Sequence, residues 1–157
     1  MKLAFVGFRH AHMYALYQHA QALPGVEIVG ACEEDAMTQQ ALAARSDIQL
    51  THDTLDRLLT TVECDAVAVG DTYARHGALI LRLLAQGKHV IVDKPVCITL
   101  AELAAIEQQL QETGLKLGCM LDMRDSPQMI GMRTLVRAGL IGEIHAISFG
   151  GQHPLML

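Results

Sequence analysis

Short runs rich in valine and isoleucine alternate along this chain with segments whose apolar residues recur at helical spacing. This alternation is typical of strand–helix–strand units, in which helices connect the parallel strands of one sheet. A further strand is expected to begin within residues 143–149. The apolar runs before it predict six strands, at residues 2–7, 27–32, 48–50, 66–69, 90–92 and 116–120.

Several of the helices predicted between these strands carry signals for where they begin or end. Gly87 follows the helix expected over 74–86, and glycine suits the left-handed conformation that ends many helices. Thr99 and Glu102 have the spacing of a capping box, which would start a helix over 100–113. Asp53 is the expected N-cap of a helix over 55–61. The remaining helices are predicted at residues 11–23, 35–45 and 127–138.

These elements predict an α/β fold, a doubly wound and Rossmann-like parallel sheet of about six strands with helices on both faces. Sheets of this class bind ligands in a crevice outside the carboxyl ends of their strands. The loops after the first, second, fourth and fifth predicted strands are therefore the candidate site.

Composition narrows the class of function. The net charge is −5, from 12 basic and 17 acidic residues without a basic cluster, so no nucleic-acid partner is expected. No stretch approaches the ~18 apolar residues of a membrane span, and the first apolar run is too short for a signal peptide. We therefore expect a cytoplasmic protein with no membrane partner. The four cysteines form no Cys-x-x-Cys pair and are expected to be reduced core residues.

The loop after the first predicted strand occupies the place of a phosphate-binding loop. Gly7 can supply the tight turn of the G-x-G-x-x-G fingerprint, but Arg9 and His12 stand where its other two glycines would be. A helix N-terminus still offers free N–H groups and a favourable dipole, and the Arg9 guanidinium can add positive charge. The alternative is that Arg9 and His10 are solvated loop residues.

An acidic run follows the second predicted strand. Glu33 lies at the strand end, where a carboxylate would accept hydrogen bonds from an adenosine ribose. Glu34 and Asp35 add negative charge that would disfavour a 2′-phosphate, so the run favours NAD over NADP. The alternative is a cluster of charges that stabilises the start of the next helix.

The fifth predicted strand ends in Asp93-Lys94-Pro95. The proline ends the strand, and Lys94 would project its ammonium group into the crevice, where it could orient a substrate hydroxyl or transfer a proton. The alternative is a solvated exit turn without a ligand.

The histidines and methionines indicate a function less clearly than the three loops described above. His10, His12 and His19 are the closest group of histidines, but their spacing gives no i, i+4 pair on a helix, so no metal site is expected. The methionines near the last helix are expected to fill the core, or to form a dimer contact if the face they cover is left open.

The chain resembles the Gfo/Idh/MocA oxidoreductases, whose hallmark is Glu-Lys-Pro after the fifth strand, with Asp93 here in place of the glutamate. The resemblance extends to Gly87-Lys88-His89-Val90, to Thr99-Leu100-Ala101-Glu102 and to Gly139-Leu140-Ile141-Gly142-Glu143. It implies a dinucleotide-binding domain over residues 1–142. Residues 143–157 would begin a C-terminal α/β domain that is otherwise absent from this chain.

The resemblance also implies roles for individual residues. Lys94 would be catalytic and contact the substrate, a sugar, polyol or related hydroxy compound that is oxidised or reduced by hydride transfer. NAD, or less favourably NADP, would be the cofactor, and the protein would form a homo-oligomer. The implied cofactor-binding residues are Gly7, Phe8, Arg9 and His10 at the pyrophosphate, Glu33 at the adenosine ribose, Asp71, Thr72, Tyr73 and His76 near the nicotinamide, and Asp93, Lys94 and Pro95.

Two departures from the family pattern leave a second function open. Thr72-Tyr73 stands where the family often has Pro-Asn, and the phosphate loop lacks its glycine pair. A non-catalytic nucleotide-binding, assembly or regulatory module with the same fold is the alternative to an oxidoreductase.

Overall fold

The computed structural model describes residues 1–148 and residue 150. It divides into two compact units, residues 1–120 and residues 121–157, which are described separately. Among the described residues, no helix is both long enough and apolar enough to cross a membrane.

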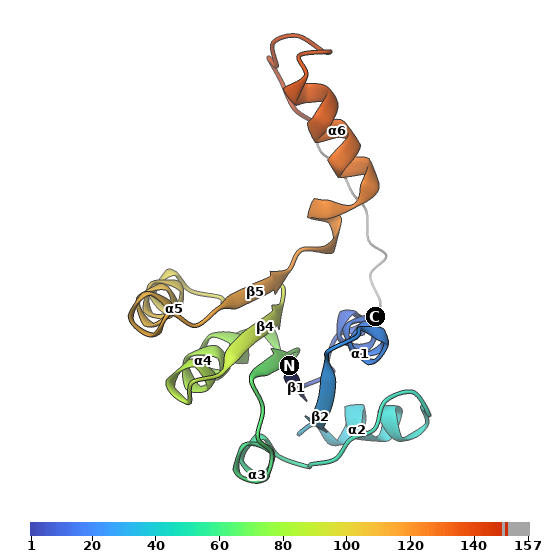
Figure 1. Cartoon of the computed structure of the whole chain (residues 1–157), viewed down its shortest axis with the longest axis vertical. Coiled ribbons are helices and arrows are strands. Elements are labelled where there is room, and N and C mark those ends of the chain that lie inside the picture. The colour runs from blue at the N-terminus through green and yellow to red at the C-terminus, as the bar shows by residue number, and fades with distance from the viewer. Residues whose placement is uncertain (149, 151–157) are drawn as a thin grey trace. The chain divides into compact units, whose positions relative to one another are not determined.

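The first unit is a parallel sheet of five strands in the order β2-β1-β3-β4-β5 (Figure 1). The strands are β1 (Lys2–Val6), β2 (Glu27–Cys32), β3 (Ala66–Val69), β4 (His89–Asp93) and β5 (Leu117–Met120). The connecting helices are α1 (Ala11–Ala22), α2 (Ala36–Ala43), α3 (Leu55–Thr61), α4 (Tyr73–Ala85) and α5 (Leu100–Thr113). The predicted fold class is thus confirmed, with five strands instead of six.

The strand order reverses at β1. The chain passes from β1 to β2 on one side and returns to place β3 on the other side of β1, with Val6 opposite Val69. The loops that follow the carboxyl ends of β1 and β3 therefore run in different directions and open a crevice between them. Sheets of this class bind ligands in such a crevice.

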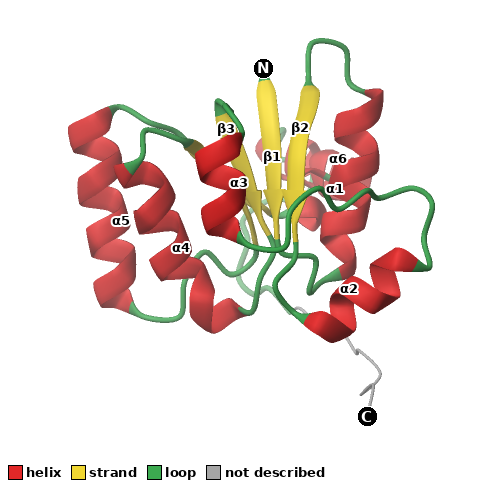
Figure 2. Cartoon of the chain, turned by 90° about the horizontal axis from the view of Figure 1, so that it is seen from below, coloured by secondary structure: helices red, strands yellow, loops and turns green. Residues whose placement is uncertain are grey.

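Alternating side chains of the strands build two core layers. Ala4 and Val6 of β1 belong to a cluster that also contains buried residues of α3, α4 and α5. Leu3 and Phe5, which alternate with them along the strand, belong to a second cluster with residues of α1 and α2. This separation follows from the two-residue period of a strand, and Figure 2 shows the sheet between its two groups of helices.

The predicted strand over residues 48–50 is wrong. Among the described residues, the segment that follows α2 joins β2 through one isolated parallel bridge, from Cys32 to His52. The Thr51 and His52 amides both donate to the Ala31 carbonyl. Ile48 is buried in the second cluster, so its apolar character reflects packing of a loop and not a strand.

The predicted N-cap of α3 is also wrong. Thr54 occupies that position, and its hydroxyl accepts a hydrogen bond from the Arg57 amide. The Asp53 carboxylate instead pairs with the Arg57 guanidinium at 3.0 Å.

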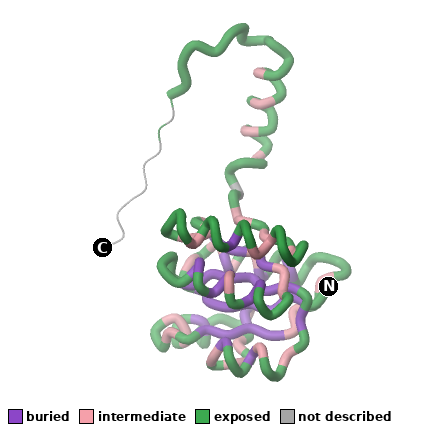
Figure 3. The backbone as a smooth tube through the Cα atoms, turned by 90° about the vertical axis from the view of Figure 1, so that its left-hand side faces the viewer, coloured by how far each residue is buried: buried purple, intermediate pink, exposed green. Residues whose placement is uncertain are grey.

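The second unit contains a 3₁₀ turn, η1 (Asp122–Asp125), and the helix α6 (Pro127–Arg137). Residues 143–148 form no strand, which corrects the expectation of one over 143–149; Phe149 lies outside the described residues. A strand needs a hydrogen-bonded neighbour, and none pairs with this segment in the described part of the unit. Met123 and Met132 are exposed and do not fill a core, whereas Met120, which was expected to pack with them, lies against the second core cluster of the first unit. Figure 3 shows the buried positions concentrated in the first unit.

Candidate functional site

The loop after β1 makes a tight turn that requires glycine. Gly7 has a φ of 80°, and a Cβ atom built on it would lie 2.7 Å from the Asp71 backbone nitrogen. The Gly7 amide donates to the Cys32 carbonyl, and the Arg9 amide donates to the Gly70 carbonyl. The loop is thus held between the ends of β2 and β3, and only glycine fits there without strain.

The helix that follows this loop begins without a side-chain cap. His10 is the N-cap of α1 and makes no capping hydrogen bond. The Met13 amide donates to the His10 carbonyl, which leaves the Ala11 and His12 amides of the first turn for an anionic ligand. The side chain of Arg9 is turned toward the end of β2, where its guanidinium lies 3.4 Å from an Asp35 carboxylate oxygen.

The Glu33 side chain is buried and hydrogen-bonded to backbone amides. The residue is only 2% exposed. Its carboxylate accepts hydrogen bonds from the Phe8 amide at 2.6 Å and the Asp35 amide at 2.8 Å. Glu33 therefore fixes the loop after β1 to the end of β2, a role that its position in the sequence did not indicate.

An ion-pair network that the sequence analysis missed joins the ends of β2 and β3. Arg75 donates to Glu34 at 2.8 Å and pairs with Asp71 at 2.9 Å. The hydrogen bond from Arg75, together with one from the Leu55 amide, lowers the pKa of the Glu34 carboxyl group below its ordinary value. The i, i+4 spacing of Asp71 and Arg75 was the signal that could have identified this pair.

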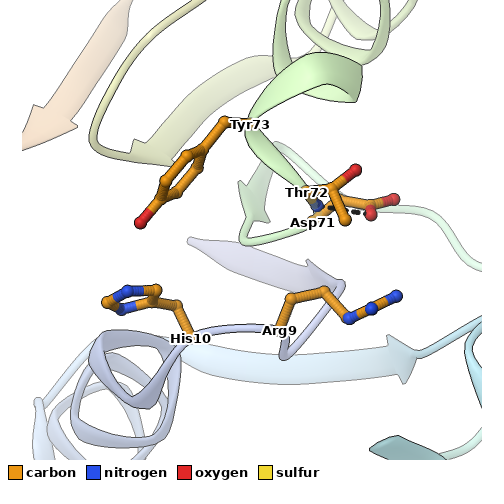
Figure 4. Close-up of a pocket in the computed structure, with 5 residues that line it drawn as sticks. All are labelled: Arg9, His10, Asp71, Thr72 and Tyr73. Carbon is orange, nitrogen blue, oxygen red and sulfur yellow. Dashed lines mark hydrogen bonds between the residues drawn. The ribbon is translucent and has the colours of Figure 1, made fainter. Parts of the chain in front are cut away.

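An open cleft of about 320 Å³ lies between the loop after β1 and the start of α4. Figure 4 shows Arg9 and His10 on one side of it, facing Thr72 and Tyr73 on the other. The cleft is lined by Arg9, His10, Asp71, Thr72 and Tyr73, all of which are among the residues predicted for the cofactor site.

Lys94 extends from the end of β4 toward the first residue of α4. Its Nζ atom lies 3.4 Å from the Tyr73 hydroxyl and 5.6 Å from the centre of the Tyr73 ring. Because Tyr73 lines the cleft, this contact brings the amine next to the candidate ligand space.

His76 lies behind this pair and is fully buried. Its Nδ1 atom is 2.7 Å from the Pro95 carbonyl oxygen, and its Nε2 atom is 2.9 Å from the Asp71 carbonyl oxygen. His76 therefore connects the segment after β4 to the segment after β3. It positions the residues of the cleft and is not itself open to a ligand.

Asp93 ends β4 with a side chain that is 1% exposed. One oxygen accepts the Lys94 amide at 2.8 Å and lies 2.9 Å from His12 Nδ1. The other oxygen has no hydrogen-bond partner, and neither has His10 Nδ1, 3.6 Å away. Burial lowers the pKa of the His10 imidazole, an effect that the nearby Asp93 charge partly opposes.

The predicted site residues thus gather at one edge of the sheet but are not equally accessible. Phe8 packs its side chain in the second core cluster, and only its amide contributes to the loop. Pro95 is exposed beside Lys94. His12 was set aside in the sequence analysis, and the structure brings it to Asp93, 81 residues away along the chain.

Comparison with known proteins finds a reductase and a dehydrogenase among the relatives of this chain. The chain is 28% identical over 119 residues to 1,5-anhydro-D-fructose reductase of Ensifer adhaerens, covering 76% of this chain and 36% of that protein. It is 27% identical over 133 residues to scyllo-inositol 2-dehydrogenase (NAD(+)) of Bacillus subtilis, covering 81% and 38%. The chain therefore spans less than half the length of these relatives.

Solved structures share the fold. A putative oxidoreductase from Erwinia carotovora atroseptica superposes with a TM-score of 0.79 at 26% identity, over 90% of this chain and 43% of that one. Residues 1–120 match the model of the oxidoreductase family with an NAD-binding Rossmann fold, the Gfo/Idh/MocA family. This match confirms the resemblance seen in the sequence: the chain belongs to the Gfo/Idh/MocA oxidoreductase family.

Proposed function

We propose that this chain is the cofactor-binding part of an NAD-dependent dehydrogenase that acts on a sugar, polyol or related hydroxy compound. The observation that carries the proposal is the cleft between the uncapped start of α1 and residues Thr72 and Tyr73, with the Lys94 amine at its border. Family membership supports the same class of reaction.

The residues around the cleft fit a dinucleotide. Gly7 allows the tight turn that brings the α1 N-terminus to the cleft, and the Ala11 and His12 amides of that terminus would suit a pyrophosphate. Arg9 replaces the second glycine, but its side chain is directed toward Asp35 and leaves the cleft open. The guanidinium at the cleft wall would add positive charge beside the phosphates.

The charges near the end of β2 favour NAD over NADP. Recognition of a 2′-phosphate usually depends on an available arginine. Here Arg75 is paired with Glu34 and Asp71, and Arg9 lies against Asp35. Hydrogen bonds from Thr38 lower the pKa of the Asp35 carboxyl group, which keeps it anionic and unfavourable for a second anion.

Lys94 is the proposed catalytic residue. The bound nicotinamide would supply the hydride chemistry, and the protein would supply orientation and charge. The Lys94 ammonium group would hold or donate a proton at the substrate oxygen, and the Tyr73 hydroxyl, 3.4 Å away, would help to hold it there. His76 would keep Asp71 and Pro95, and with them Tyr73 and Lys94, in this arrangement.

The names of the relatives support the substrate class. One is an anhydrofructose reductase and another an inositol dehydrogenase, and both names describe small polyhydroxy compounds. Because the chain spans less than half of each, its substrate remains part of the proposal. The homo-oligomer and the cytoplasmic location remain predictions.

Titration of the chain with NADH, followed by fluorescence, tests the proposal. We expect saturable binding that is tighter for NADH than for NADPH. Arg9→Ala should weaken it about tenfold, the size expected for one charge-assisted contact. Arg82→Ala is the matched control, because Arg82 is similarly exposed but pairs with Asp56 away from the cleft. Absence of saturation at millimolar NADH would refute the proposal.

The non-catalytic module makes the opposite prediction. That alternative would be favoured if the chain bound neither NADH nor NADPH and if the Lys94→Ala variant matched the parent in every ligand assay. A Lys94→Ala variant that still binds NADH but differs in its response to a polyol would favour the enzyme.

A further inference from the structure

Two imidazoles and one carboxylate come together at the start of α1. The rings of His10 and His12 lie with their centroids 4.5 Å apart, next to Asp93 at the end of β4. One potential ligand atom from each of the three residues lies within 4.8 Å of the other two. The three side chains thus converge on one small volume.

Two polar atoms within this group lack a hydrogen-bond partner. Asp93 Oδ2 and His10 Nδ1 are both buried and unpaired, and Asp93 as a whole is only 1% exposed. They lie 3.6 Å apart, which is too long for a hydrogen bond. Buried polar groups are nearly always satisfied in folded proteins, so this pair indicates a missing partner between or beside them.

We propose that His10, His12 and Asp93 form a binding site for a divalent transition-metal ion of the zinc class. Bonds of about 2.1 Å around a tetrahedral ion place neighbouring ligand atoms about 3.4 Å apart. His12 Nδ1 lies 2.9 Å from one carboxylate oxygen of Asp93, and His10 Nδ1 lies 3.6 Å from the other. Both distances are close to that value. Since no two of the three ligand atoms are more than 4.8 Å apart, a bound ion would have to draw them together by no more than about 1.4 Å.

The ligand types select the class of ion. Magnesium and calcium prefer oxygen ligands alone, whereas imidazole nitrogen suits zinc, cobalt, nickel and copper. Three protein ligands leave a fourth position open, as in zinc sites that also bind water or a small molecule. A dication here would place positive charge beside the cleft that His10 lines. The site does not depend on the proposed dehydrogenase function.

Titration of the chelator-treated chain with Co²⁺ alone, without nucleotide, tests the site. Bound Co²⁺ in a tetrahedral environment has strong visible absorption, which free Co²⁺ lacks. We expect one Co²⁺ per chain with this absorption, and its displacement by Zn²⁺. His10→Ala and His12→Ala should each weaken binding at least tenfold, because each removes one of three ligands.

His19→Ala is the matched control, since His19 lies exposed on the same helix outside the cluster. It should leave the affinity and the spectrum unchanged. Far-ultraviolet circular dichroism of each variant would show that the fold is intact. Either no binding at millimolar Co²⁺, or equal binding by the parent, His10→Ala and His12→Ala chains, would overturn the proposal. Because no nucleotide is present, a negative NADH titration would not affect this result.

Discussion

Gly7 and Gly25 share a positive φ, of 80° and 84°, but differ in their surroundings. A Cβ atom at Gly25 would meet nothing within 4 Å, whereas one at Gly7 would press on the backbone of residues 70 and 71. The sequence identified Gly7 as the turn of a phosphate loop. It could not show that Glu33 is the residue that holds this loop, because that contact depends on where β2 lies relative to β1.

This pair of glycines gives a prediction about stability. Gly25→Ala should lower the free energy of unfolding by about 1 kcal/mol, the cost of placing alanine in the left-handed region. Gly7→Ala should lower it by about 3 kcal/mol or more, because the backbone clash adds to that cost. Urea denaturation measures both. Equal losses for the two variants would contradict the close packing around the loop.

At the level of elements, the capping box predicted the start of α5 correctly, whereas the short run over 48–50 was wrongly predicted as a strand. The capping box of α5 is present, with the Glu102 amide donating to Thr99 Oγ1 at 3.1 Å and the Thr99 amide donating to Glu102 at 3.2 Å. Such a box depends only on residues three positions apart. The segment over 48–50 would form a strand only beside a neighbouring strand. A run of three residues is too short for its pattern to distinguish a strand from a buried loop.

The capping box gives the prediction for this scale. Thr99→Ala should destabilise the chain by about 1 kcal/mol, because the Glu102 amide loses its acceptor at the start of α5. Thr99→Ser should restore most of that loss, since serine keeps the hydroxyl. Thermal unfolding followed by circular dichroism compares the three chains. If serine behaved as alanine does, the effect would arise from the lost methyl group and not from the cap.

At the scale of the whole molecule, the family fold was predictable because its alternating pattern spans the chain. The site was predictable only in part: the sequence indicated the loops that form it, but contacts such as His12 to Asp93 join residues 81 positions apart. The chain also divides into compact units after residue 120, whereas the domain end expected at residue 142 stays a prediction. The distribution of buried residues follows the same division, because they are concentrated in the first unit.

That distribution predicts that residues 1–120 fold without the rest of the chain. Every member of the two buried core clusters lies within them, and none of the residues 121–148 whose burial is described is buried. A chain ending at Met120 should therefore unfold in one cooperative step, with a urea midpoint close to that of the full chain. Its m-value should be nearly the same, because m follows the surface exposed on unfolding. A shortened chain that is unfolded, or whose m-value is much lower, would mean that residues beyond 120 complete the core, and a second shortened chain ending at Arg137 would show whether α6 supplies them.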